Sequence, residues 1–554
     1  MASLDDKLGV RPIASPLHSI NTSTESSNMG DNTEAVAENP GIFAKLSKAW
    51  RVATQGTVVS SIFILLTTSV GAGTLSLPYG FAQGGLVFSS IIFFVIMLIS
   101  IHVGSMLFAG KRYAEEVYPD REVWGYADLA EVAYGTIGKI AVLLTIAVLL
   151  FLSLIAYMIF ARDQLEAIVS YVLVATNNIP ACSPLLNCAL LMCMAFLPVF
   201  PITLLRNLSP LQFTSYLSAT CVFFVATAMS IDTGIYWTSS DFNASIADHS
   251  IQLAPVGVNG SLTVISYCSL AFICHFNLLP LQKELKGPVT KVKLYSIIVG
   301  AILTAYVLYN IVIFAGYFRF FESLKSDVMV NYPKNNHLML AARVALLFML
   351  VTSYPVLLHP TRDSINSVII LIKDLVSNKL KKRRARKNNV NTEAITLLDD
   401  VDSKIPKGSN KNKIPTLIWF CETWIIFALT FLPASFITDV SLVWNFVGSI
   451  GGVLVLYIYP AACYLKLRFA RNRLRSELGN ITIRSQYNSA AVVKELVAWT
   501  ILIIGLLLLV VENYQAISQA VIITSGSKEP SGLCFQLDCK VVEEWNHTYW
   551  GLYS

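Results

Sequence analysis

Residues 69–78 of the chain, SVGAGTLSLP, lie in the middle of its first long apolar run. Relative to alanine, a continuous helix loses about 1 kcal/mol for each glycine and about 3 kcal/mol for an interior proline. Close packing of small residues would explain Gly71 and Gly73 alone, but the Pro78 that follows them favours a break in the helix. Backbone groups freed by a break inside a bilayer must be buried in protein or line a cavity. The stretch therefore predicts a broken membrane span beside a ligand site.

A second apolar run is interrupted in a similar way. Residues 266–280, SYCSLAFICHFNLLP, carry hydroxyl, thiol, imidazole and amide side chains and end in a proline. This stretch belongs to the sixth apolar run, whereas residues 69–78 belong to the first. Transporters built from inverted repeats have broken helices at corresponding positions, with the substrate between them near the bilayer midplane. The pair of interruptions therefore indicates a transporter more strongly than either one alone.

The composition is that of a membrane protein. Of the 554 residues, 55% are hydrophobic and 14% are charged, and the mean hydropathy is +0.59. Soluble proteins carry about 25% charged residues, which excludes a soluble metabolic enzyme, a nucleic-acid-binding protein and a disordered scaffold. We expect an all-α polytopic membrane protein with about eleven transmembrane helices. The apolar runs that predict them lie at about residues 57–83, 86–110, 139–161, 186–204, 211–232, 261–281, 294–316, 338–359, 415–435, 441–465 and 493–512.

Lysine and arginine set the orientation, because they gather in cytosolic loops. With a cytosolic N-terminus, roughly 34 of the 41 basic residues fall on the cytosolic side and about five fall outside. The first 52 residues are polar, without a secretory signal, and are expected to be disordered. The segments outside the core are then this cytosolic N-terminus at 1–52, a basic cytosolic loop at 466–492, the eleventh helix at 493–512 and an extracytosolic tail at 513–554.

Sequons and cysteines agree with this orientation. Asn243, Asn259 and Asn546 open Asn-x-Ser/Thr sequons at expected extracytosolic positions, so we expect a glycoprotein. Four cysteines also fall outside, where disulfide bonds are permitted. They allow three pairings, among which the sequence does not choose; they are Cys182, Cys188, Cys534 and Cys539.

Several motifs resemble the amino acid/auxin permease family, and most closely its sodium-coupled neutral amino acid transporters. Residues 71–79, GAGTLSLPY, are similar to the family's first-helix signature, and residues 271–275, AFICH, are similar to its sixth helix. Further matches, in chain order, are Tyr157 with Asp163, residues 201–208 (PITLLRNL) and residues 355–362 (PVLLHPTR).

The resemblance implies a LeuT-like core of two inverted five-helix repeats plus one extra C-terminal helix. In this chain the core would span residues 53–465, with repeats at about 57–232 and 261–465 and a cytosolic linker at 372–414. It also implies secondary active transport of amino acids. The expected membrane is the plasma membrane, with an endolysosomal or vacuolar membrane as the alternative.

The resemblance also places a cation site between the first and eighth helices. Thr352 and Ser353 match its hydroxyl position, and Thr67 stands where the sodium-coupled members have an asparagine, near Val70. A threonine hydroxyl is a different ligand from an amide carbonyl, so sodium coupling, proton coupling and uncoupled exchange all stay open. His275 is a candidate proton relay, with a neutral imidazole bonded inside the bundle as the alternative.

The substrate hypothesis uses the backbone of both interruptions. The α-carboxylate of an amino acid would meet N–H groups around residues 71–74, and its α-amine would meet carbonyl groups near Ser69 and Ser269. Tyr157 and Phe272 would contact the substrate side chain, although Phe272 would serve equally as a packing aromatic. No charged residue falls in this pocket, which favours neutral substrates. The expected substrate-binding residues are Ser69, Val70, Gly71, Ala72, Gly73, Thr74, Tyr157, Ser269 and Phe272.

A transporter is the favoured function, and a transporter-like amino acid sensor is the alternative. A sensor would signal through a cytosolic regulatory partner bound at the N-terminus or at the basic linker 379–413. The chain has no metalloprotease, phosphate-loop or nucleophile-elbow motif, so we expect neither an enzyme nor an organic cofactor. The expected partners are an amino acid, Na⁺ or H⁺ as coupling ion, and the lipid bilayer, but no nucleic acid.

Overall fold

A computed structural model describes nine ranges of the chain. They are residues 56–175, 188–198, 200–204, 211–239, 251–255, 257–387, 416–437, 439–477 and 489–526. All regular secondary structure in these ranges is helical. This confirms an all-α polytopic membrane protein.

The first half of the described chain contains two spans that are each built from several short helices. Its elements are α2 (Val58–Ser69), η1 (Ala72–Ser76), α3 (Leu77–Gly84), α4 (Leu86–Val117), α5 (Tyr126–Ala175), α6 (Cys188–Phe196), α7 (Phe200–Thr203), α8 (Leu211–Trp237), α10 (Gly257–Ala271), η4 (His275–Asn277) and α11 (Leu278–Leu281).

The second half consists mainly of long helices, with two π-helical segments in the middle of one span. Its elements are α12 (Lys291–Phe320), η5 (Phe321–Ser323), η6 (Val328–Asn331), α13 (His337–Lys387), α15 (Thr416–Phe436), α16 (Val440–Phe446), the π-helices η7 (Val447–Gly452) and η8 (Leu454–Ile458), α17 (Tyr459–Glu477) and α19 (Ser489–Gly526).

Nine helices in the described ranges are long and apolar enough to cross a bilayer, and α2 with α3 makes a tenth, bent span. The span expected at residues 186–204 is not one helix here. Its described part consists of the short helices α6 and α7, and α6 ends at Phe196. Pro198 follows two residues later, and a proline interrupts a helix because it lacks an N–H donor and clashes with the preceding turn.

Several helices are longer than their apolar runs predict. Helix α5 begins at Tyr126, before the run at 139–161, and bends at Gly135, whose φ is +71°. Helix α19 continues from the expected end at residue 512 to Gly526. Hydropathy marks only the part of a helix that matches hydrocarbon, so polar extensions go undetected.

Helix α13 also extends into the range expected to be a linker. It runs through Lys387, although the linker was expected from residue 372 and its basic part from 379. Residues 361–387 contain no glycine or proline that would end the helix. The remaining linker residues, 388–414, lie outside the described ranges.

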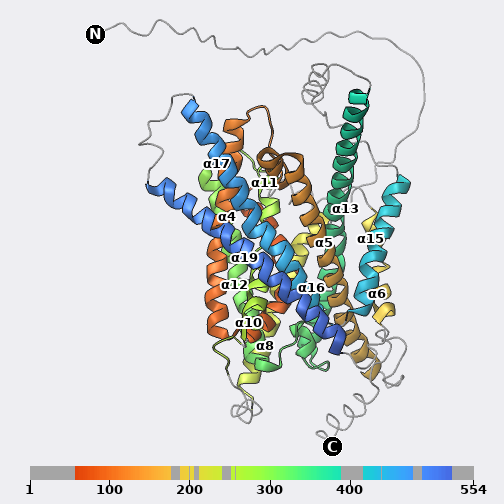
Figure 1. The fold of residues 1–554 in the computed structure, drawn as a ribbon. Helices are drawn as coiled ribbons and strands as arrows, with labels where there is room; N and C mark the ends of the chain where they lie inside the picture. Colours follow the sequence, from red (N-terminus) through yellow and green to blue (C-terminus); the bar gives the residue numbers. More distant parts are fainter. Residues whose placement is uncertain are drawn as a thin grey trace, which may run out of the picture. The chain divides into compact units, whose positions relative to one another are not determined.

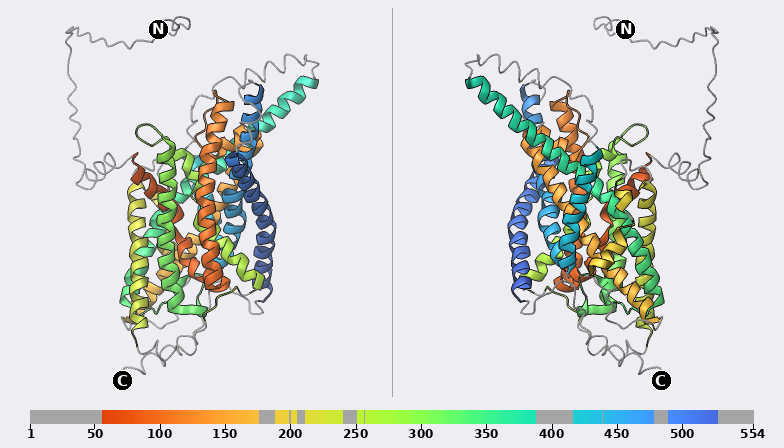
Figure 2. Two further views of the ribbon diagram at one scale, coloured as in Figure 1. Left: turned by 90° about the vertical axis from the view of Figure 1, so that its left-hand side faces the viewer. Right: turned by 90° about the vertical axis from the view of Figure 1, so that its right-hand side faces the viewer.

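The helices of residues 51–554 form one bundle in which helices distant in sequence pack together (Figure 1). Helix α13 packs on α5 and α8, α17 on α4, α12 on α2 and α10 on α3. Helix α19 lies across the outside of this packing, against α10, α16 and α17 (Figures 1 and 2). We call the end of the bundle at which α2 begins the Val58 end, and the opposite end, where α3 meets α4, the Gly84 end.

The Gly84 end of the first span is fixed by a tight turn. Gly85 has a φ of +72°, and a Cβ at this position would collide with the backbone of Ala254. The Leu86 N–H donates to the Gln252 carbonyl at 2.7 Å. Only glycine meets both the conformational and the steric demand at this position, so the turn holds α3 and α4 against the 251–255 segment.

Candidate functional site

The first span is interrupted where the sequence predicts. Helix α2 ends at Ser69, and Val70 and Gly71 have non-helical dihedral angles, with ψ values of 86° and −159°. The chain resumes as the 3₁₀-helix η1 and then as α3, and the two halves of the span differ in direction by 56°. The break leaves backbone groups around Val70–Gly73 outside regular helix, as expected when glycines and a proline occur together.

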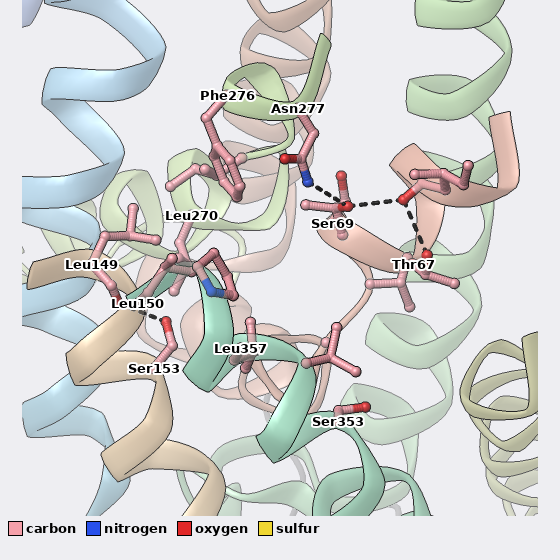
Figure 3. Close-up of a pocket in the computed structure, with 18 of the residues that line it drawn as sticks. Thr67, Ser69, Leu149, Leu150, Ser153, Leu270, Phe276, Asn277, Ser353 and Leu357 are labelled. Atoms are coloured by element: carbon pink, nitrogen blue, oxygen red, sulfur yellow. Dashed lines mark hydrogen bonds between the residues drawn. The ribbon is translucent and has the colours of Figure 1, made fainter. Parts of the chain in front are cut away.

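The sixth apolar run is interrupted as well. Helix α10 ends at Ala271, and η4 and α11 follow after the non-helical residues 272–274. The Tyr309 hydroxyl donates to the Ala271 carbonyl at 2.8 Å, so it satisfies one acceptor at the end of the helix. Asn277 Nδ2 donates to Thr68 Oγ1 at 3.1 Å and joins the two interrupted spans directly. Both predicted breaks are therefore confirmed, and they lie side by side (Figure 3).

A cavity of about 580 Å³ lies between the two interruptions. Its walls come from α2, η1, α5, α8, α10, α13 and α16. On the first span the lining begins at Ser60 and continues past the break to Ser76. Glu284, an exposed residue next to α11, also lines it. The cavity therefore reaches the surface at the Val58 end.

Polar contacts close the bundle at the Gly84 end. Arg162 of α5 pairs with Asp163 at 2.8 Å and donates to the Ala434 and Ile437 carbonyls beside α15. Gln164 Nε2 donates to Asp327 Oδ2 at 2.8 Å. These contacts tie α5 to α15 and to the loop that holds η6, so helices that surround the cavity are joined beyond its inner end.

Asp327 is the most deeply buried carboxyl group of this loop, at 2% exposure. Its Oδ1 accepts the Met329 N–H at 2.9 Å. Burial raises its pKa to about 8, and the nearby charge of Asp163 acts in the same direction, while the Met329 N–H, Arg343 and Gln164 oppose the shift. The group therefore titrates near neutral pH, far above the ordinary aspartate range.

The cavity brings together most of the predicted site residues. Those in its walls are Thr67, Ser69, Val70, Gly71, Gly73, Thr74, Tyr157 and Ser353. Figure 3 shows Thr67 and Ser69 on one side of this space and Ser353 on another. The side chain of Ala72 lies outside the described part of the structure.

Three predicted residues lie away from the cavity. Ser269 Oγ and Tyr457 Oη are 2.9 Å apart, behind the cavity wall. Phe272 is fully buried and stacks on Phe93 with ring centroids 5.0 Å apart, so it is a packing aromatic in this structure. The Thr352 hydroxyl donates to the Phe348 carbonyl within α13. The direction of each side chain decides whether it reaches the cavity, because residues one position apart in the chain face different neighbours.

His275 also lies off the cavity, at 0% exposure. Its Nε2 is 3.0 Å from the Ser100 carbonyl of α4. A carbonyl only accepts, so Nε2 carries the proton in this contact. The position matches the alternative of an imidazole bonded inside the bundle.

Two hydroxyl groups lie close together near the place where a cation site was expected. Ser353 Oγ lies 3.3 Å from Ser218 Oγ of α8, a cavity residue that no motif of the sequence marks. Pro355 in α13 cannot donate to the Val351 carbonyl, and Val70 belongs to the interruption of the first span. Hydroxyl and carbonyl oxygens are ligands that an alkali cation accepts, so this region can hold Na⁺.

Three further polar side chains line the cavity without a hydrogen-bond partner among the described residues. They are the Ser76 hydroxyl, the Tyr267 hydroxyl and the Trp444 indole N–H. Among the described lining residues only Glu284 is charged, and it lies at the Val58 end. Buried polar groups normally pair. These three atoms have essentially no exposed surface in this conformation, so a ligand in the cavity reaches them only if neighbouring side chains move.

Several predictions fall on parts of the chain without structural description. Asn243, Asn546, Cys182, Cys534 and Cys539 lie outside the described ranges. Asn259 is exposed near the start of α10, and Cys188 is the first residue of α6. The described residues contain no group of three or more His, Cys, Asp or Glu side chains that could hold a metal ion.

An apolar helical bundle with a cavity between two interrupted spans defines a polytopic membrane protein of the transporter class. Residues 54–518 match the model of the family described as transmembrane amino acid transporter protein. The chain belongs to this family, which confirms its resemblance to the amino acid/auxin permeases and excludes an enzyme.

Relatives from several vertebrates that carry the name sodium-coupled neutral amino acid transporter 7 are similar to this chain. The chain is 21% identical to that of Danio rerio over 430 residues, which covers 77% of this chain and 82% of the relative. It is 23% identical to that of Bos taurus over 418 residues, covering 74% and 80%. It is 22% identical to that of Homo sapiens over 418 residues, covering 74% and 79%.

Proposed function

We propose that this protein is a secondary active transporter that binds a neutral amino acid between its two interrupted spans. The observation that carries the proposal is the cavity of about 580 Å³ that both interruptions line. The Gly71 and Thr74 N–H groups already donate to the Ser69 and Gly71 carbonyls. The amino acid's carboxylate would therefore meet the N–H groups of Ala72 and Gly73 at the start of η1. Its ammonium would meet carbonyl groups near Ser69 and Ser269.

The charge of the cavity supports a neutral side chain on the substrate. No charged residue lines the described cavity walls beside the two interruptions. A charged substrate side chain would lose its hydration there without gaining a partner, which costs several kcal/mol. The neutral Ser76, Tyr267 and Trp444 side chains in the cavity wall likewise offer no charge with which an ionised side chain could pair. The printed names of the relatives also describe neutral amino acid transporters.

We further propose Na⁺ as the coupling ion, bound by Thr67, Val70 and Ser353 with Ser218 as a new member of the site. Thr352, expected with them, would take part only if α13 turned, because its side chain lies off the cavity. The relatives' names describe sodium-coupled proteins. A proton relay through His275 is less favoured, since this side chain is bonded to Ser100 and does not reach the cavity.

Transport would follow from alternating access in a LeuT-like arrangement of repeats. The cavity reaches the surface at the Val58 end, and polar contacts join the helices at the Gly84 end. With the N-terminus in the cytosol, as the basic residues predict, this is the conformation open to the cytosol. Transport in the plasma membrane is preferred to sensing, because the relatives are named as transporters.

Uptake into proteoliposomes tests this function. Labelled neutral, acidic and basic amino acids are offered separately, with sodium removed in one arm and the pH gradient collapsed in another. We expect sodium-dependent uptake of neutral amino acids only. The variant Gly73→Leu should abolish uptake while the protein remains folded, because a Cβ at Gly73 already approaches Leu270 and Trp444 at 3.9 Å in the cavity wall. Normal uptake by Gly73→Leu would contradict the proposed site.

A further inference from the structure

A glutamate is buried at the contact between α19 and α10. Glu512 has an exposed fraction of 1%, and its Oε2 accepts a hydrogen bond from Ser266 Oγ at 2.9 Å. Its Oε1 has no hydrogen-bond partner among the described residues. The Ser266 hydroxyl is thus the one donor that this carboxyl group has in the described structure.

In the part of the chain that the structure describes, no positive charge compensates this carboxyl group. Helix α19 packs against α10, α16, η7, η8 and α17. Among the described residues of these elements, the titratable side chain near Glu512 is Tyr457 of η8, which in turn lies near Cys268 of α10. Neither supplies a cation. The nearest ion pair on α19, between Glu495 and Arg468 of α17, lies 17 residues earlier, which is about 25 Å along a helix.

The other polar contacts in this part of α19 join neutral groups. Asn445 of α16 donates to Gln519 at 2.6 Å, and Gln515 donates to Thr263 of α10 at 2.9 Å. Asn513 contacts Ser449 of η7 at 3.4 Å. These residues dock α19 on its neighbours by neutral hydrogen bonds. Glu512 differs from them because it is the one member of this polar row that can carry a charge.

Physical chemistry limits the state of such a group. An ionised carboxylate inside a membrane span needs a cation or several donors, since it has about four lone-pair positions and has lost its hydration. Glu512 has one hydroxyl donor. A proton on Oε1 removes the charge and leaves Oε2 free to accept from Ser266. The protonated form leaves one buried O–H at Oε1 without an acceptor among the described residues, which costs far less than an uncompensated charge. The site therefore favours the protonated form, and it holds the charged form only if its neighbours rearrange.

The position of Ser266 connects this group to the cavity. On α10, Tyr267 and Leu270 line the cavity, whereas Ser266 and Ser269 face the other way, toward Glu512 and Tyr457. The interruption of the span begins at Phe272, less than two turns beyond Ser266. Behind α10 lie two π-helical segments, η7 and η8, a geometry often found at functional sites. A change of charge at Glu512 thus acts on the helix that forms the cavity wall.

We propose that Glu512 is a proton-binding site that controls the movement of α10 during transport. Binding forms an O–H bond at Oε1 and neutralises the side chain; release breaks that bond, leaves a carboxylate and returns the proton to water. The neutral state keeps α10 docked on α19 through Ser266, and the charged state weakens this docking because the carboxylate draws in further donors or water. This inference rests on the proposed transport function for its effect on flux, but proton binding itself does not.

The test uses the full chain in proteoliposomes and compares two variants on one helix. Glu512→Gln mimics the protonated group, because it has the same shape, no charge and an oxygen that accepts from Ser266. Glu495→Gln is the matched control: it removes a carboxylate from α19 at the exposed end, where Glu495 pairs with Arg468. Thermal unfolding of both variants verifies that they are folded.

Infrared difference spectra and uptake rates are then recorded over a pH series. We subtract the spectrum of Glu512→Gln from that of the unaltered chain. The difference should contain the C=O band of a protonated carboxyl group, and this band should disappear at alkaline pH. The spectrum of Glu495→Gln should still contain the same band. Uptake by the unaltered chain should change with pH by up to about tenfold per unit, the limit for one proton. Uptake by Glu512→Gln should not change with pH, and Glu495→Gln should follow the unaltered chain.

The two readouts separate the two proposals. A difference band that titrates in protein without amino acid uptake supports proton binding at Glu512 and contradicts the transport function. Absence of any carboxyl band that Glu512→Gln removes overturns the inference, whatever the uptake. If uptake by Glu512→Gln keeps the pH profile of the unaltered chain, the proposal that Glu512 controls the movement of α10 is overturned.

Discussion

Adding one methyl group at Gly71 should lower the affinity for substrate, because the methyl group would clash with one atom of the cavity wall. A Cβ at Gly71 would lie 2.6 Å from the Tyr157 hydroxyl oxygen, whereas the next nearest atom, Tyr157 Cζ, would be 3.7 Å away. The φ of Gly71 is −119°, which any residue adopts, so the effect of Gly71→Ala is steric and not conformational. Gly73→Ala places its methyl group 3.9 Å or more from its neighbours.

The size of the effect follows from these distances. Ordinary contacts between heavy atoms lie at about 3.5–4.0 Å, so the Gly71→Ala contact is about 1 Å too short. Overpacking of this kind typically costs about 1–3 kcal/mol, which corresponds to about fivefold to about 150-fold in an equilibrium constant. We expect Gly71→Ala to lower the apparent substrate affinity by a factor within this range. The loss in Gly73→Ala should be smaller.

A double-mutant cycle isolates the cause. Tyr157→Phe removes the oxygen at 2.6 Å and leaves the ring at 3.7 Å, so Gly71→Ala in the Tyr157→Phe background should lose less affinity than Gly71→Ala alone. The assay is substrate affinity from uptake in proteoliposomes for all four members of the cycle, each verified for folding by thermal unfolding. The reasoning is refuted if Gly71→Ala and Gly73→Ala lose the same affinity, or if the two substitutions at 71 and 157 are additive.

Two further predictions concern Asp327, which lies beyond the inner end of the cavity, and Ser353, which lies in the cavity wall. Asp327 binds a proton more tightly in the folded protein, where its pKa is about 8, than in the unfolded chain, where it is about 3.9; its contribution to stability should therefore fall as pH rises from about 4 to about 8. Asp327→Asn should flatten this part of the thermal-stability profile, and an unchanged profile would contradict the assigned burial effect. Ser353→Ala removes one oxygen from the proposed sodium site, so the sodium concentration for half-maximal uptake should rise about tenfold, the equivalent of one hydrogen bond to a charged group. An unchanged sodium dependence would exclude Ser353 as a ligand.

Local chemistry made the two interruptions predictable. Gly71, Gly73 and Pro78 disfavour a helix at known cost, and the polar stretch that ends in Pro280 does the same in the sixth run. The structure breaks both spans at these places. Such signals depend on backbone geometry within a few residues, so they need no knowledge of the neighbouring helices.

The side chains around the cavity were less predictable, because their direction depends on packing. Phe272 was a candidate for the substrate pocket, but it stacks on Phe93, while Tyr267 on the same span lines the cavity. Ser218 and Trp444 come from helices without an interruption motif at those positions, so only their packing brings them to the site. Glu512 lay at the expected end of the eleventh span, where a glutamate is ordinary, and the longer α19 places it inside the span.

The central claim is that the amino acid lies between the two interruptions, held by their backbone. A cryo-electron microscopy map of the protein in lipid with a saturating transported amino acid measures this directly. The account predicts substrate density beside residues 69–74 of the first span, with its carboxylate at the start of η1 and the second interruption within contact distance. Density at another place, with the cavity between the two interruptions empty at saturation, would contradict it.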